Sequence, residues 1–155
     1  MKNMRYITIC AGILLMLACG KDKLETKPSI KIKSMSGNIV PVNGGLEIVL
    51  EFNDKEGDVD DSLFVRRLRL NTLGAVRGER LIDSFYLMVP AFNKKSTGEI
   101  ILNLKYNFHL KDAIEAPKVD GKEVADSIMF RFALQDKGGN TSDTLNTEQI
   151  VVERQ

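Results

Sequence analysis

Tryptophan is absent from the sequence, and cysteine and histidine are nearly so. The two cysteines, Cys10 and Cys19, lie close to the start. The chain from Gly20 onward can therefore hold neither a disulfide framework nor a cysteine-based zinc site. The one histidine, His109, closes an expected strand, where we expect a half-buried structural residue rather than a catalytic base. With no second histidine, and no glycine loop that opens a helix to cradle phosphate, the sequence favours a protein that is not an enzyme.

A large excess of one charge is missing as well. The 22 basic and 21 acidic residues give a formal net charge of +1. No basic field is available to attract nucleic acid, so we expect no nucleic-acid partner. The hydrophobic fraction of 43% and the charged fraction of 28% are ordinary for a globular chain. The length of 155 residues fits a single domain.

The first residues have the pattern of a cleavable leader. Lys2 and Arg5 form a positive start, and the apolar run that follows is shorter than the ~20 residues of a membrane-spanning helix. The run ends in Met16-Leu17-Ala18-Cys19, which resembles the lipobox of bacterial lipoproteins, with methionine where that family more often has leucine. We therefore interpret residues 1–18 as a lipoprotein signal peptide.

This resemblance implies a lipid anchor on Cys19. In bacterial lipoproteins the cysteine thiol receives a diacylglycerol, the leader is cut in front of it, and the new amine is acylated, for instance with palmitate. Gly20 follows the cysteine, whereas enteric bacteria use aspartate there to retain a lipoprotein in the inner membrane. The resemblance thus implies the outer membrane, with the protein facing the periplasm or the cell surface. Residues 19–28 are polar, end in proline, and are predicted to form a flexible tether.

From Ser29 onward, apolar and polar residues alternate as they do in half-buried β-strands. The clearest run is Leu46 to Phe52, and the others cover residues 30–33, 39–42, 63–70, 81–89, 99–106, 126–134 and 150–152. With residues 30–42 counted as one initial segment, about seven strands with turn residues between them predict an all-β fold, a single immunoglobulin-like antiparallel β-sandwich over residues 29–155. The pattern is similar to immunoglobulin-like and cadherin-like domains, although the marker tryptophan and cysteines of antibody domains are missing.

Two polar loops contain the candidate metal ligands. Residues 54–61 hold five carboxylates, and residues 136–143 add two more and an asparagine. In the predicted topology these loops join the second strand to the third and the sixth to the seventh, and both emerge at the same end of the sandwich. Calcium takes about six to eight oxygen ligands. The first interpretation of both loops is ordinary solvated turns, and the alternative is a calcium site that takes most of its ligands from Asp54, Glu56, Asp58, Asp136 and Asn140.

Three arginines follow the acidic loop along the predicted strand 63–70. We expect Arg66, Arg67 and Arg69 to lie on a solvated face of the sheet and to pair with carboxylates of the acidic loop, such as Asp58 or Asp61. The alternative interpretation is a binding patch that recognises carboxylate or phosphate groups.

Taken together, these patterns favour a lipid-anchored protein of the cell envelope that acts as a non-catalytic binding or structural module, with stabilisation by calcium as the alternative interpretation of its two polar loops. Its partners would be the membrane, through the lipid, and an envelope protein or a glycan. One alternative is a carbohydrate-binding accessory lipoprotein that stacks sugars on Phe85, Tyr86 and Phe92. The other is a small hydrolase that uses two carboxylates in a cleft.

Overall fold

The computed structural model describes residues 27–59, 61–71, 80–111 and 115–154, with the backbone alone for residues 80–82. The predicted signal peptide, the predicted lipidation site Cys19 and most of the predicted tether lie outside the described residues. In the described part of the chain, no helix is long and apolar enough to cross a membrane.

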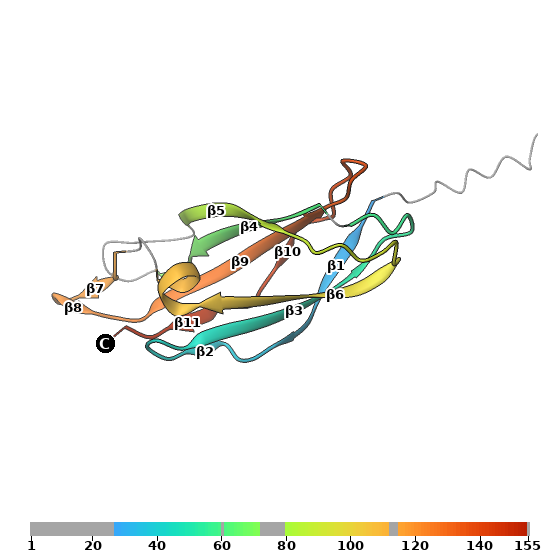
Figure 1. Cartoon of the computed structure of the whole chain (residues 1–155). Coiled ribbons are helices and arrows are strands. Elements are labelled where there is room, and N and C mark those ends of the chain that lie inside the picture. The colour runs from blue at the N-terminus through green and yellow to red at the C-terminus, as the bar shows by residue number, and fades with distance from the viewer. Residues whose placement is uncertain (1–26, 60, 72–79, 112–114, 155) are drawn as a thin grey trace, which may run out of the picture.

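Two sheets make up the body of the molecule (Figure 1). The smaller sheet has the strand order β1-β3-β6, built from Ser29–Met35, Gly45–Asn53 and Thr97–Lys105. The larger sheet has the order β2-β11-β9-β4-β5, and β10 also pairs with β9. Its strands are β2 (Ile39–Val40), β11 (Ile150–Val152), β9 (Asp126–Gln135), β4 (Ser62–Arg69), β5 (Arg80–Met88) and β10 (Leu145–Asn146). A short π-helix, η1 (Tyr106–Leu110), follows β6, and a small hairpin joins β7 (Lys118–Val119) to β8 (Lys122–Glu123).

This arrangement confirms the predicted all-β sandwich. Consecutive long strands are distributed over the two sheets, and the chain crosses from β5 in the larger sheet to β6 in the smaller one. One ladder departs from the antiparallel prediction, because β2 pairs with β11 in parallel, at Ile39 with Val151 and Val40 with Val152. The short segment β2 thus transfers the start of the chain to the edge of the larger sheet.

The core is formed by apolar side chains that alternate with polar ones along three long strands, as predicted. The inward rows come from β3, β6 and β9, and their members are at most 6% exposed: Leu46, Ile48, Leu50, Phe52, Ile100, Leu102, Leu104, Ile128, Phe130, Phe132 and Leu134. These rows meet between the sheets in a single cluster of buried residues. Because successive side chains of a strand point to opposite faces, one apolar row from each strand is enough to close this core.

The β7–β8 hairpin was not predicted, although its turn carries a recognisable signal. Asp120 and Gly121 both have positive φ, at 50° and 77°. Asp-Gly is the preferred pair for a two-residue hairpin turn with this backbone, because both of its residues tolerate the left-handed region. The sequence Lys118-Val-Asp-Gly-Lys-Glu123 is only six residues long, too short to show strand alternation.

The predicted solvated face is wrong for two of the three arginines. Arg67 is 1% exposed and Arg69 is 7% exposed, because they occupy the same inward parity of β4 as the core residues Leu63 and Val65. Arg66 has the opposite parity, and its guanidinium lies 5.7 Å from the ring centre of Phe64. A patch of all three arginines on one face is therefore not formed.

The ion pairs of the buried arginines also differ from the prediction. Arg67 binds the carboxylate of Asp83 through Nε and Nη2, at 3.0 and 2.9 Å. Arg69 donates from Nη2 to Asp126 Oδ1 at 2.8 Å, and Arg154 binds the other oxygen of Asp126. Their described carboxylate partners are thus Asp83 and Asp126 rather than the acidic loop. These pairs stabilise the end of the sandwich where β4 ends and β9 begins.

His109 has structural contacts on both sides. Its Nδ1 accepts a hydrogen bond from the backbone N–H of Lys105 at 2.9 Å, and its carbonyl accepts one from Arg67 Nη1 at 2.6 Å. Burial, and then the positive charges of Arg67 and Lys105, lower the pKa of the imidazole, against a smaller opposing effect of Asp83. The neutral imidazole is therefore favoured in the folded protein.

We expect this lowered pKa to make the protein less stable in mild acid. Below about pH 6.5 the unfolded chain takes up a proton at His109 before the folded chain does, so the free energy of unfolding falls as the pH decreases. His109→Asn keeps an acceptor near the position of Nδ1 but cannot titrate. Urea unfolding at pH 7.5 and pH 5.5 should show a larger loss for the wild type than for His109→Asn, and equal losses would contradict this assignment.

Candidate metal centre

The two polar loops lie side by side at one end of the sandwich, as the predicted topology required (Figure 1). One loop follows β3 and the other follows β9, and the described chain begins at the same end, at Lys27. A backbone hydrogen bond joins the loops directly, from the N–H of Lys137 to the carbonyl of Asp58 at 3.0 Å. Residues that are far apart in the sequence are thereby held in contact.

Two of the predicted ligands continue the inward rows of their strands. Asp54 lies two residues beyond Phe52, and Asp136 lies two residues beyond Leu134, so both point toward the end of the core. They are 1% and 0% exposed. Burial of an ionised carboxylate costs several kcal/mol unless opposite charge or hydrogen-bond donors compensate it.

A tight turn brings a third carboxylate to these two. Asp54 Oδ2 accepts hydrogen bonds from the backbone N–H groups of Gly57 at 2.7 Å and Asp58 at 3.1 Å. Gly57 has a φ of 69°, and a Cβ atom there would lie 2.8 Å from the backbone carbonyl group of Lys94. Only glycine meets both requirements, so Gly57 directs the chain such that Asp58 faces Asp54 and Asp136.

The three carboxylates form a compact cluster. One oxygen from each of Asp54, Asp58 and Asp136 lies within 4.8 Å of the others. Asp54 Oδ1 and Asp58 Oδ1 are buried and accept no hydrogen bond from a described group. None of the ion pairs between described side chains reaches any of the three, whereas the buried Asp126 at the opposite end of β9 is paired with two arginines.

Electrostatics within the cluster favour a bound cation. Burial, and then the negative charges of Asp136 and Asp54, raise the pKa of Asp58. A divalent cation would offset this repulsion and would coordinate the buried oxygens that lack a donor. The donors are all oxygens, which calcium and magnesium prefer, while zinc sites mostly use nitrogen or sulfur.

Two predicted ligands do not join the cluster as ligands. Glu56 is exposed and is not one of the residues whose oxygens gather in the cluster. Asn140 supports Asp136 instead, and donates from its backbone N–H at 2.8 Å and from its side-chain amide at 3.0 Å. These bonds orient the Asp136 carboxylate, so Asn140 has a positioning contact in place of the predicted direct one.

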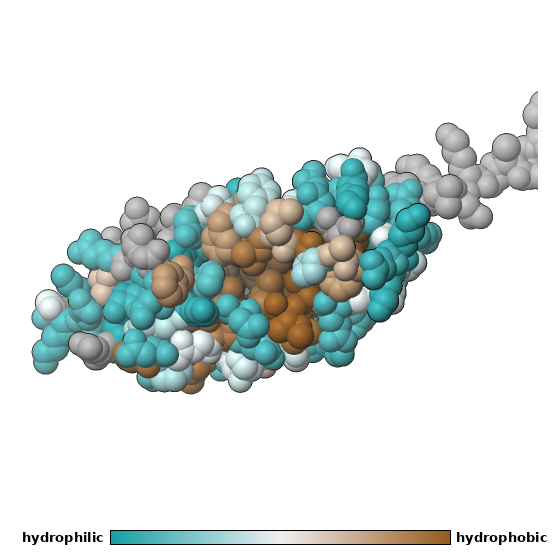
Figure 2. Space-filling view, in the orientation of Figure 1, coloured by the Kyte–Doolittle hydropathy of each residue, from teal (hydrophilic) through white to brown (hydrophobic). Residues whose placement is uncertain are grey.

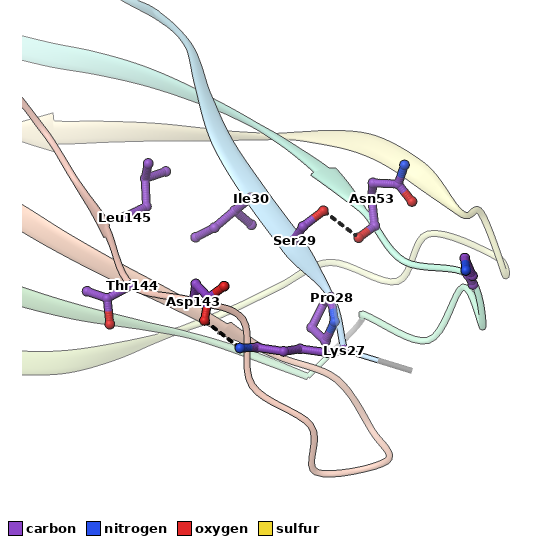
Figure 3. Close-up of a pocket in the computed structure, with 9 residues that line it drawn as sticks. Lys27, Pro28, Ser29, Ile30, Asn53, Asp143, Thr144 and Leu145 are labelled. Carbon is purple, nitrogen blue, oxygen red and sulfur yellow. Dashed lines mark hydrogen bonds and ion pairs between the residues drawn. The ribbon is translucent and has the colours of Figure 1, made fainter. Parts of the chain in front are cut away.

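A polar recess lies beside the cluster at the same end of the molecule (Figure 3). It has a volume of about 330 Å³ and is lined by Lys27–Ile30, Asn53, Lys55 and 143–145. Lys27 Nζ pairs with Asp143 at 2.5 Å, and Ser29 Oγ donates to the carbonyl of Asn53 at 3.2 Å. The start of the described chain is thus tied to the loop that carries Asp136.

A second recess, of about 370 Å³, is an apolar groove between β5 and β6 (Figure 2). Each of these strands pairs with one neighbour only in the described part of the chain, so the groove lies between two open sheet edges. Side chains of both strands and of the segment between them line it, including Leu87, Val89, Phe92, Ile100 and Leu102. Met88 and Ile101 at its rim are 80% and 57% exposed.

The aromatic residues predicted to stack on sugars do not form one platform. Phe85 packs against the core, with its ring centre 6.2 Å from that of His109. Phe92 packs edge-on against Phe52 at 4.8 Å. Tyr86 alone of the three is strongly exposed, at 67%, on the opposite face of β5 from Phe85.

Comparison with known proteins finds only distant likenesses. No protein-family model matches the chain, and no curated protein does. A sporulation control protein from Bacillus subtilis is similar at 12% identity and a TM-score of 0.42, over 83% of this chain and 50% of that chain. A β-glucosidase from Erythrobacter marinus follows at 11% and 0.40, over 81% and 15%. This chain spans half or less of these proteins, and the likenesses define neither a family nor a function.

Proposed function

We propose that the protein is a lipoprotein of the outer membrane, anchored through Cys19, whose β-sandwich is a non-catalytic binding module with a calcium ion held between its two polar loops. The lipobox resemblance at residues 16–19 supports the anchor. The cluster of Asp54, Asp58 and Asp136 supports the calcium site. Neither proposal depends on the distant structural likenesses.

One observation carries the calcium proposal. Asp54 is 1% exposed, yet its Oδ1 has no donor among the described groups, and one oxygen each of Asp58 and Asp136 lies within 4.8 Å of an oxygen of Asp54. A loop that only needed to be soluble would expose these acids to water. Their inward direction at the ends of β3 and β9 is what an internal cation site requires.

A binding role is supported by the apolar groove between β5 and β6. Open sheet edges and exposed apolar side chains such as Met88 and Ile101 are typical of surfaces that receive a protein partner. The carbohydrate alternative has less support, since the three candidate aromatics are separated. The hydrolase alternative requires carboxylates that a substrate can reach, and Asp54 and Asp136 are buried.

Calcium should raise the thermal midpoint of the soluble chain from Lys21 to Gln155. A ligand that binds only the folded state at 100 times its Kd stabilises it by about 2.7 kcal/mol, which is a shift on the order of 10 °C for a domain of this size. The midpoint is measured in millimolar calcium, in magnesium, and in chelator. An unchanged midpoint in several millimolar calcium would refute the site.

Asp54→Asn provides the discriminating variant. The asparagine carbonyl can still accept the hydrogen bonds from Gly57 and Asp58, while the amide group replaces the oxygen that has no donor. The calcium shift should disappear in this variant. Glu56→Gln removes the same charge from the exposed side of the same loop, and its calcium shift should equal that of the wild type.

A further inference from the structure

The calcium site lies at the end of the sandwich where the tether enters. Lys27 begins the described chain and is paired to Asp143 in the loop that follows β9, and Figure 3 shows this contact. Asn53, directly before Asp54, hydrogen-bonds to Ser29. The opposite end carries the β7–β8 hairpin, η1 and the C-terminus (Figure 1).

The tether limits how far this end can lie from the membrane. Seven residues lie between Cys19 and Lys27, so eight Cα–Cα steps join the two. Fully extended, they span at most about 28 Å, which is comparable to the length of the ten-residue strand β9. If Cys19 carries the lipid, the two polar loops stay near the headgroups, while the β7–β8 hairpin can lie much farther away.

Exposed lysines lie on the loops around the carboxylate cluster, which is mostly buried. They are Lys55 after β3, Lys94 and Lys95 before β6, and Lys137 after β9. Lys94 lies directly against Gly57, and Lys55 lines the same recess as Lys27.

The balance of these charges depends on the cation. The two acidic loops hold seven carboxylates in residues 54–61 and 136–143, against five lysines at this end of the molecule, Lys27, Lys55, Lys94, Lys95 and Lys137. One divalent cation offsets the excess of two negative charges. Without it, the excess negative charge repels an anionic surface that comes within a Debye length, about 8–10 Å. With it, the net charge of this set is zero, and the exposed lysines can contact anionic headgroups without that repulsion.

From this geometry we infer that the metal-bearing end docks onto anionic lipid headgroups of the membrane that holds the anchor, and that calcium controls this docking. The inference rests on the proposed lipid anchor and calcium site. The proposed partner of the calcium site is a lipid surface, because the tether is short and the loops are charged.

The test uses the acylated protein reconstituted into vesicles. The chain has no cysteine after Cys19, so one introduced thiol can carry a fluorophore. Ser96→Cys places the label beside the metal loops, where the Ser96 carbonyl bonds to Asp54, and Glu123→Cys places it on the far hairpin. Vesicles contain a headgroup quencher and either neutral lipid alone or added anionic lipid.

In anionic vesicles, calcium should increase quenching of the label at position 96 at least twofold over chelator, and leave the label at position 123 unchanged. Neutral vesicles and the Asp54→Asn variant should remove the effect. If calcium raises the thermal midpoint but does not change quenching at position 96, the docking inference is overturned and the calcium site stands. If calcium changes neither, both are overturned.

Discussion

Asp126→Ala should lower the free energy of unfolding by about 3–5 kcal/mol, because it removes the buried carboxylate that two arginines share. Asp126 is 0% exposed, and its two oxygens bind Arg69 and Arg154, which are 7% and 9% exposed. The cluster joins the end of β4, the start of β9 and the chain beyond β11. Urea unfolding of the wild type and the variant measures the difference.

Two further variants show whether charge causes this loss. Glu51→Gln removes one partner of Lys31 in an exposed pair with an N–O distance of 2.9 Å, and should cost about 0–1 kcal/mol. Replacing Asp126, Arg69 and Arg154 together by apolar residues of similar volume should restore much of the stability, since no charge is then left unpaired. A triple variant as unstable as Asp126→Ala would instead assign the loss to packing.

Most of the fold could be predicted because alternation and burial agree in the long strands. Leu46 to Phe52 and Ile128 to Leu134 show a period of two with few interruptions, and the inward rows of β3 and β9 follow it residue by residue. The same rule would have placed Arg67 and Arg69 inward, since they continue the row of Leu63 and Val65. The prediction of a solvated face follows the charge of these arginines and not their parity in the strand, although a buried counterion can compensate the charge.

The candidate site was predictable in part for a related reason. The topology alone placed the loops after β3 and β9 at one end, and the parity of their strands directs Asp54 and Asp136 inward. Asp58 belongs to the cluster and Glu56 does not. This difference depends on the turn at Gly57, which has a positive φ. Spacing in the sequence does not reveal this turn, since many Asp- and Gly-rich loops have similar composition.

The two carboxylates at the ends of β9 illustrate how position determines role. Asp126 and Asp136 occupy the same inward row, separated by the four apolar residues of the core. Arg69 and Arg154 compensate the negative charge of Asp126 at that end of the strand. Asp136 faces two further carboxylates, so the proposed cation would offset charge at this end of the strand, whereas arginines do so at the other.

Phe132→Ala should also cost about 3–5 kcal/mol, because it opens a cavity at the centre of the sandwich. Phe132 is 0% exposed, pairs across the ladders with Val65 and Leu145, and stacks on Phe130 with ring centres 6.1 Å apart. Phe64→Ala removes a ring of the same size from the half-buried outer face of β4 and should cost much less. Urea unfolding compares the two, and similar losses would contradict the assignment of faces.

The same variant separates the core from the metal site. Phe132 lies four residues before Asp136, about 13 Å along the strand, and effects at such distances are usually additive. Phe132→Ala should therefore be destabilised equally in calcium and in chelator, and keep the calcium-induced gain of the wild type. Asp54→Asn should show the opposite behaviour, with a nearly intact stability in chelator and no gain from calcium. A calcium gain lost in Phe132→Ala would contradict this independence and would mean that the cavity in the core alters the metal site, because an unaltered site gains the same binding free energy whenever the folded state persists.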